Sequence, residues 1–150
     1  MKYAICNETF VDWPLEKAFS YARETGYTGI EIAPFTLASS ATEVSKEQRD
    51  TVRSQIQDAG LECVGLHWLL AKTEGFYLTS PEAAIRSRTS AYLAELARLC
   101  RDLEGSIMVL GSPQQRNLLE GVSHEQGMDL AAEAIREAMP VLEDCGVTLA

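Results

Sequence analysis

Five residues suited to binding a small polar molecule stand in or just after short apolar segments of this sequence. Glu31 lies in Gly-Ile-Glu-Ile-Ala-Pro-Phe, His67 and Trp68 lie in Gly-Leu-His-Trp-Leu-Leu, and Ser112 and Arg116 lie in Gly-Ser-Pro-Gln-Gln-Arg. A carboxylate, an imidazole and a hydroxyl exchange hydrogen bonds with polar ligands, and a guanidinium offers a planar fork to a phosphate or carboxylate. We therefore predict Glu31, His67, Trp68, Ser112 and Arg116 as substrate-binding residues.

Each of these residues also has a structural interpretation. Glu31 could meet solvent or a neighbouring Lys or Arg, His67 could be a satisfied structural histidine, and Arg116 could pair with a nearby Glu. An unpaired carboxylate in a protein interior is costly, which favours a binding role for Glu31. Four loop residues could reach or cover the same site, although packing elsewhere is the alternative: Glu8, Trp13, Phe76 and Tyr77.

Alternating strands and helices must position these residues. Repeatedly, a helical segment ends near a glycine and a short apolar strand follows, which is typical of strand-helix units with a parallel sheet. We expect strands over residues 3–6, 28–33, 62–68, 107–111 and 147–150. We expect helices to begin near Asp12 or Trp13, at Ser45, at Ser80 and at Ser123, with capping boxes at Ser45 and Ser123.

The last helical segment has two features that the structure can test. Pro140 lies inside its pattern and is expected to kink or split the helix, because proline removes a backbone donor and crowds the preceding turn. Its apolar positions follow helical spacing and predict this buried face: Met128, Ala131, Ile135, Ala138 and Leu142.

Two patterns favour a barrel over an open sheet. The segment Cys-Asn-Glu-Thr-Phe after the first strand has no glycine, whereas nucleotide-binding open sheets usually carry a Gly-rich turn there. In the third strand, alternation predicts Val64 and Trp68 on a bulky helix-packed face and Gly65 and His67 on a smaller opposite face. A barrel whose active site lies at the carboxyl ends of its strands has this pattern.

The segments that contain Glu31, His67 and Arg116 resemble the xylose isomerase-like TIM barrels, in particular their sugar phosphate isomerase/epimerase branch. The resemblance runs from Met1 to Ala150 and covers the first half of that barrel, up to its fifth strand. We therefore expect an α/β fold of parallel strand-helix units that form the amino-terminal half of one (β/α)₈ domain.

This resemblance implies metal-dependent proton transfer next to the carbonyl of a sugar or sugar phosphate. The family holds a divalent ion (Mn²⁺, Mg²⁺ or Co²⁺) with two Glu, an Asp and a His from strands five to eight, and all four would lie after Ala150. We therefore expect no catalytic or metal-binding residue within this chain, and expect it to supply substrate contacts.

Composition limits the other partners. The net charge of −9, from 13 basic and 22 acidic side chains, disfavours nucleic acid. No apolar run approaches the roughly 20 residues of a membrane helix, and Met1-Lys2 leads into no long apolar segment, so we expect a cytoplasmic protein without a membrane partner. The four cysteines are scattered and are expected to be buried thiols.

Two further functions remain open. The bare edges of the first and fifth strands could pair, which would make the chain a non-catalytic half-barrel that self-assembles or joins a complementary half. An apurinic endonuclease of the same superfamily is the other alternative, in which His67 would bind metal. The sequence has Gly111-Ser112 where that enzyme has a second histidine.

Overall fold

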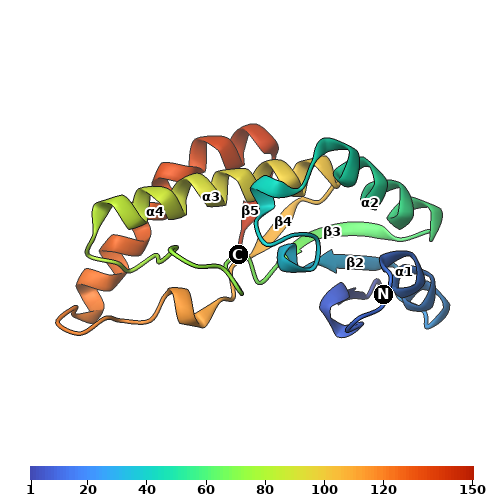
Figure 1. Cartoon of the computed structure of the whole chain (residues 1–150), viewed down its shortest axis with the longest axis horizontal. Helices are drawn as coiled ribbons and strands as arrows, with labels where there is room; N and C mark the ends of the chain where they lie inside the picture. The colour runs from blue at the N-terminus through green and yellow to red at the C-terminus, as the bar shows by residue number, and fades with distance from the viewer.

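The computed structural model describes residues 1–150 as one parallel sheet with helices between its strands (Figure 1). The strands are β1 (Ala4–Cys6), β2 (Gly29–Ile32), β3 (Glu62–His67), β4 (Ile107–Val109) and β5 (Thr148–Leu149). Each strand pairs with the next in the chain, in the order β1-β2-β3-β4-β5. This arrangement matches the first half of a (β/α)₈ barrel and confirms the expected fold class.

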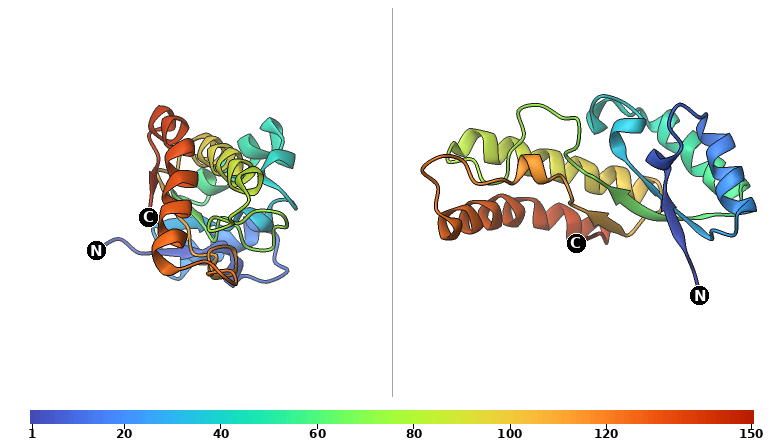
Figure 2. Two further views of the ribbon diagram at one scale, coloured as in Figure 1. Left: turned by 90° about the vertical axis from the view of Figure 1, so that its left-hand side faces the viewer. Right: turned by 90° about the horizontal axis from the view of Figure 1, so that it is seen from below.

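Four helices cover one face of the sheet. They are α1 (Leu15–Glu24), α2 (Lys46–Asp58), α3 (Ala83–Asp102) and α4 (His124–Cys145). The long helices α3 and α4 run side by side (Figure 2). No helix is both long enough and apolar enough to cross a bilayer. The opposite face of the sheet, which we call the open face, carries no helix.

The serine caps are only partly as expected. Ser123 forms a complete capping box with Gln126. At Ser45 the side chain accepts a bond from the backbone of Gln48, but the Gln48 amide turns away and donates to Leu37 O at 3.0 Å, so half of the box is missing. The first helix has Pro14 as its N-cap, one or two residues after the expected cap.

Helix α4 differs from two expectations. It is not split at Pro140, and Ala138 and Leu142 are buried on either side of the proline; the expected kink stays a prediction. Met128 is 60% exposed rather than buried. The neighbouring Gly127 is buried instead, against Leu118, so the buried stripe starts one residue earlier than the apolar pattern predicts.

A β-bulge changes which side chains face the helices. The pairing of β2 with β3 passes from Ile30–Cys63 to Glu31–Gly65, so Val64 is the extra residue. Cys63 packs against the helix-covered core, whereas Val64 lies on the open face beside Gly29. The strict alternation expected for this strand is therefore wrong before Gly65, and the bulge returns His67 to the open face.

A buried ion-pair network joins helices α2 and α3. The Arg49 side chain, 11% exposed, reaches Glu95 at 2.7 Å and Asp102 at 2.9 Å, and its Nε donates to Val44 O at 3.0 Å. Burial alone would raise the pKa of Asp102, but bonds from Arg101 and Arg49 outweigh it and hold that pKa below its ordinary value.

Candidate functional site

Glu31 and His67 meet at the carboxyl ends of β2 and β3. The distance from His67 Nδ1 to Glu31 Oε2 is 3.4 Å, and the two side chains are 27% exposed for the histidine and 25% for the glutamate. Both lie on the open face, since the flanking Ile30, Ile32 and Leu66 belong to the helix-covered core. We call the carboxyl-end edge of the open face the mouth. The expectation that these two side chains share one face near the mouth is confirmed.

The hydrogen bonding of this pair is incomplete. The separation of 3.4 Å satisfies the distance expected of an ion pair, yet His67 Nδ1 is buried without a hydrogen-bond partner. A hydrogen bond requires more than this distance, because a good N–H···O bond is about 2.9 Å long and nearly linear. The pair is therefore in contact without a formed hydrogen bond.

Trp68 does not lie on the face that alternation predicts. Strand β3 ends at His67, and Trp68 has a φ of 59°, which turns its side chain back toward the histidine. The two rings stack with centroids 6.3 Å apart and planes inclined by 28°. Trp68 is 42% exposed, so its indole remains available to a ligand beside His67.

Ser112 and Arg116 have different positions in the loop after β4. The Ser112 hydroxyl is buried; it accepts from Leu70 N at 2.9 Å and donates to Leu110 O at 2.9 Å, so it ties this loop to the one after β3. Arg116 is exposed and donates from Nε to Gly111 O at 2.8 Å. A substrate contact is more easily made by Arg116 than by Ser112, and both roles stay predictions.

The long loop after β3 is held down at its far end. Phe76 stacks on Tyr92 of α3, with ring centroids 4.4 Å apart. Tyr77 donates its hydroxyl to Asn117 O at 3.0 Å, and Thr79 donates to the same oxygen at 2.6 Å. Phe76 therefore packs on helix α3 and does not cover the candidate site, which is the second of the two roles considered for it.

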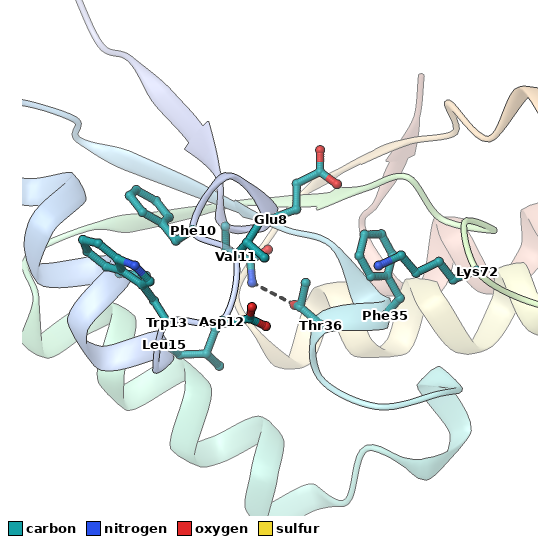
Figure 3. A pocket seen from close by; sticks show the side chains of 11 residues that line it. Glu8, Phe10, Val11, Asp12, Trp13, Leu15, Phe35, Thr36 and Lys72 are labelled. Atoms are coloured by element: carbon teal, nitrogen blue, oxygen red, sulfur yellow. Dashed lines mark hydrogen bonds between the residues drawn. The ribbon is translucent and has the colours of Figure 1, made fainter.

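A pocket of about 310 Å³ opens between the loops that follow β1 and β2 (Figure 3). Glu8, Asp12 and Trp13 line it from the first loop, Phe35 from the second, and Lys72 from the loop after β3. Figure 3 shows Lys72 beside Phe35. The Lys72 ammonium lies 4.4 Å from the centroid of the Phe35 ring. Carboxylates, aromatic faces and an ammonium group together suit a hydroxylated ligand.

Asn7 holds the two walls of this pocket together. It is 4% exposed, donates from Nδ2 to Thr36 Oγ1 at 2.8 Å, and accepts from Ala33 N at 2.8 Å. Glu8 and Trp13 are loop candidates from the sequence. Asp12, Phe35 and Lys72 are new, and the signal that could have found them is their position within a few residues of a strand end. None of the five predicted substrate-binding residues lines this pocket.

The family model described as xylose isomerase-like TIM barrel matches residues 19–150. The chain belongs to this family. Among curated proteins no significant match was found. Solved structures share the fold at low sequence identity, as expected for a xylose isomerase-like barrel.

Three solved structures illustrate this likeness. A D-psicose 3-epimerase from Clostridium cellulolyticum H10, solved with D-tagatose, superposes with a TM-score of 0.76 at 18% identity, covering 99% of this chain and 51% of that one. A D-psicose 3-epimerase solved in the presence of D-fructose gives 0.79 at 17% identity, with 99% and 51% covered. The 3-keto-D-glucoside 4-epimerase from E. coli gives 0.74 at 15% identity, with 99% and 54% covered. The chain thus spans about half the length of these structures.

The side chains of this xylose isomerase-like chain do not make a metal centre by themselves. No group of three or more His, Cys, Asp and Glu side chains lies close enough to hold an ion. Glu31 and His67 offer two donors to one site, fewer than the four ligands that the family resemblance implies. Glu31 and His67 alone therefore do not fit a metal centre.

Proposed function

We propose that residues 1–150 are the amino-terminal half of one sugar isomerase or epimerase barrel, and that the mouth of this half binds the sugar. The observation that carries the proposal is the contact of Glu31 and His67 at 3.4 Å, at the strand ends where barrels of this architecture bind substrate. The sugar and sugar phosphate epimerases among similar structures support the choice of ligand.

Each side chain at the mouth has a role suited to its chemistry. His67 and Glu31 exchange hydrogen bonds with sugar hydroxyls, and Trp68 offers an apolar face to the ring. Arg116 and Lys72 are the cations available to a phosphate group, of which Arg116 can bind it through two bonds. This half orients the sugar for proton transfer next to its carbonyl, while the groups that move the proton belong to the complementary half.

Sugar binding by the purified chain tests this proposal. We expect D-fructose or D-tagatose to bind in isothermal titration calorimetry, and the double variant Glu31→Ala/His67→Ala to weaken binding about tenfold or more, since each hydrogen bond to a charged or polar group contributes about 1 kcal/mol or more. Glu62→Ala is the matched control, because this carboxylate lies on β3 at the opposite end and is 67% exposed.

Phosphate preference is measured in the same titration. A ketohexose 6-phosphate should bind more tightly than the free sugar, and Arg116→Ala should remove that difference. Absence of binding by every sugar, or equal binding by the double variant and the wild type, would reject the sugar-binding proposal.

A second candidate function is assembly of half-barrels. Strands β1 and β5 are unpaired on their outer edges, and an apolar groove lies beside β5, lined by Leu110, Ile135, Met139, Val147 and Leu149. Exposed strand edges and apolar grooves favour association. A second copy of the chain or a complementary half is the occupant that this candidate requires.

The oligomeric state tests this second candidate. We expect sedimentation velocity to show a dimer in the micromolar range, and Met139→Lys to shift it toward monomer because the charge enters the groove. Met128→Lys is the control on the same helix, outside the groove and 60% exposed. A monomer at all concentrations contradicts self-assembly and leaves the sugar-binding proposal standing.

The apurinic endonuclease alternative gains no support from the site, because His67 has a single carboxylate neighbour and no second histidine. A cytoplasmic location and the lack of nucleic-acid and membrane partners stay predictions.

A further inference from the structure

One polar atom of the mouth lacks the partner that a buried group normally has. His67 Nδ1 is buried without a hydrogen-bond partner, and Glu31 Oε2 lies 3.4 Å from it. Buried polar atoms in folded proteins are nearly always paired, so an orphan beside a carboxylate needs an explanation. The gap to a charge-assisted bond of about 2.8 Å is small enough for a rotation of the Glu31 side chain to close.

Glu31 is the one carboxylate within 4.0 Å of this nitrogen. In the sheet register, His67 lies beside Val109 of β4, which offers no polar side chain, and the Trp68 ring stacks against it. Cys6 of β1 lies next to Glu31, and burial raises the pKa of this thiol to about 11, so it remains uncharged at neutral pH.

The other imidazole nitrogen has a different environment. His67 Nε2 is not among the buried unpartnered atoms, and the side chain is 27% exposed, so Nε2 is the nitrogen that a ligand can reach. Which nitrogen of a neutral histidine carries the proton is set by the bond that the other one makes. Whether Nε2 carries a proton therefore depends on the hydrogen bond that Nδ1 makes.

We propose that Glu31 is a positioning residue that keeps the proton of neutral His67 on Nδ1. The Nε2 lone pair then faces the mouth as a hydrogen-bond acceptor for a ligand hydroxyl. One oxygen of Glu31 thus sets the tautomer and ring orientation of His67, and its other oxygen is left for a ligand hydroxyl. The tautomer follows from the geometry of the chain, whereas the ligand hydroxyl rests on the proposed sugar function.

Nitrogen-15 NMR of the imidazole rings tests the tautomer directly. The chain has two histidines, and His124, exposed in the first turn of α4, is an internal reference. With both rings neutral, we expect most of His67 to be protonated on Nδ1 and His124 to show the Nε2–H form that a solvated imidazole prefers. A wild-type His67 that is mostly Nε2–H overturns the proposal, and this outcome depends on no variant.

Variants of Glu31 separate the tautomer effect from folding. Glu31→Leu removes the acceptor at similar volume and should reverse the His67 tautomer, whereas Glu31→Gln keeps an acceptor oxygen and should retain the Nδ1–H form. Glu62→Leu, at the far end of β3, should change neither histidine. Retention of the Nδ1–H form in a folded Glu31→Leu protein contradicts the role of Glu31.

Sugar titrations of the same samples separate this inference from the proposed function. If the tautomer result holds and sugar binds, Glu31→Gln should bind more tightly than Glu31→Leu by several-fold. If the tautomer result holds but no sugar binds, the positioning role of Glu31 stands and the sugar-binding function fails. If sugar binds while His67 is mostly Nε2–H, the function stands and the positioning role fails.

Discussion

Replacement of Gly65 by alanine is expected to destabilise the protein by more than about 4 kcal/mol, which is most of the stability of a typical small domain. A Cβ atom at this position would overlap the carbonyl oxygen of Ile107 and lie 2.7 Å from its carbonyl carbon. The obstacle is the backbone of β4 rather than a flexible side chain. Strands β3 and β4 would have to separate, and they form the centre of the sheet.

Urea denaturation followed by circular dichroism measures this effect. Gly121→Ala is the matched control, because Gly121 also has a positive φ, +79°, but no atom lies within 4 Å of the position that an added methyl group would take. Gly121→Ala should lower the free energy of unfolding by about 1 to 2 kcal/mol, the cost of a left-handed backbone for a residue with a Cβ atom. Similar losses for the two variants would mean that the close approach of β3 and β4 is not what requires glycine.

Replacement of Arg49 by alanine is the second large effect, with an expected loss of about 3 to 5 kcal/mol. The substitution leaves Glu95 and Asp102 without their buried cation and removes the donor to the carbonyl oxygen of Val44. Removing one partner of a buried pair costs more than the pair contributes relative to apolar residues, because Glu95 and Asp102 stay partly desolvated and keep only the more exposed Arg98 and Arg101 as partners.

Arg98→Ala is the control for this prediction, because Arg98 pairs with the same Glu95 at 3.1 Å but is 44% exposed. Solvent screens such a pair, so its loss should cost less than about 1 kcal/mol. Chemical denaturation of both variants gives the comparison. If the two variants lose the same free energy of unfolding, the buried network between α2 and α3 does not contribute more to stability than an exposed ion pair.

The bulge at Val64 connects the stability of the sheet to the candidate site. Had the alternation continued unbroken from Cys63, His67 would lie on the face of the sheet that the helices cover. The extra residue reverses the side-chain direction after it, and Gly65 allows the close contact with β4 that this geometry needs. The position of His67 beside Glu31 therefore depends on the same backbone feature that makes Gly65 hard to replace.

Much of the fold could be predicted from local patterns. The order of strands and helices follows from apolar segments separated by glycines and serine caps, and the strand ends on which Glu31 and His67 stand place both at the carboxyl-end edge of the sheet. Local patterns failed where packing between distant segments decides the outcome. Met128 is exposed because Gly127 packs against Leu118, a contact that helical spacing does not encode.

The candidate site was predictable only in part for the same reason. Glu31, His67 and Arg116 could be selected by residue type and position, whereas the pocket joins Asp12 to Lys72 through the fold of three separate loops. Ser112 looked available from its place in a polar loop, yet its hydroxyl is used to bind the neighbouring loop. Hydrogen bonds between loops are formed in three dimensions, and no spacing in the chain reveals them.

The amino-acid sequence by itself determined the strand-helix alternation, the parallel sheet and the residues that end its strands, because hydrophobic period, turn residues and caps act over a few neighbouring positions. Only the tertiary structure decided the bulge in β3, the contact between Glu31 and His67 and the pocket that Asp12 and Lys72 line. These features arise where segments far apart in the chain pack together, and the free energy of that packing depends on all of the partners at once.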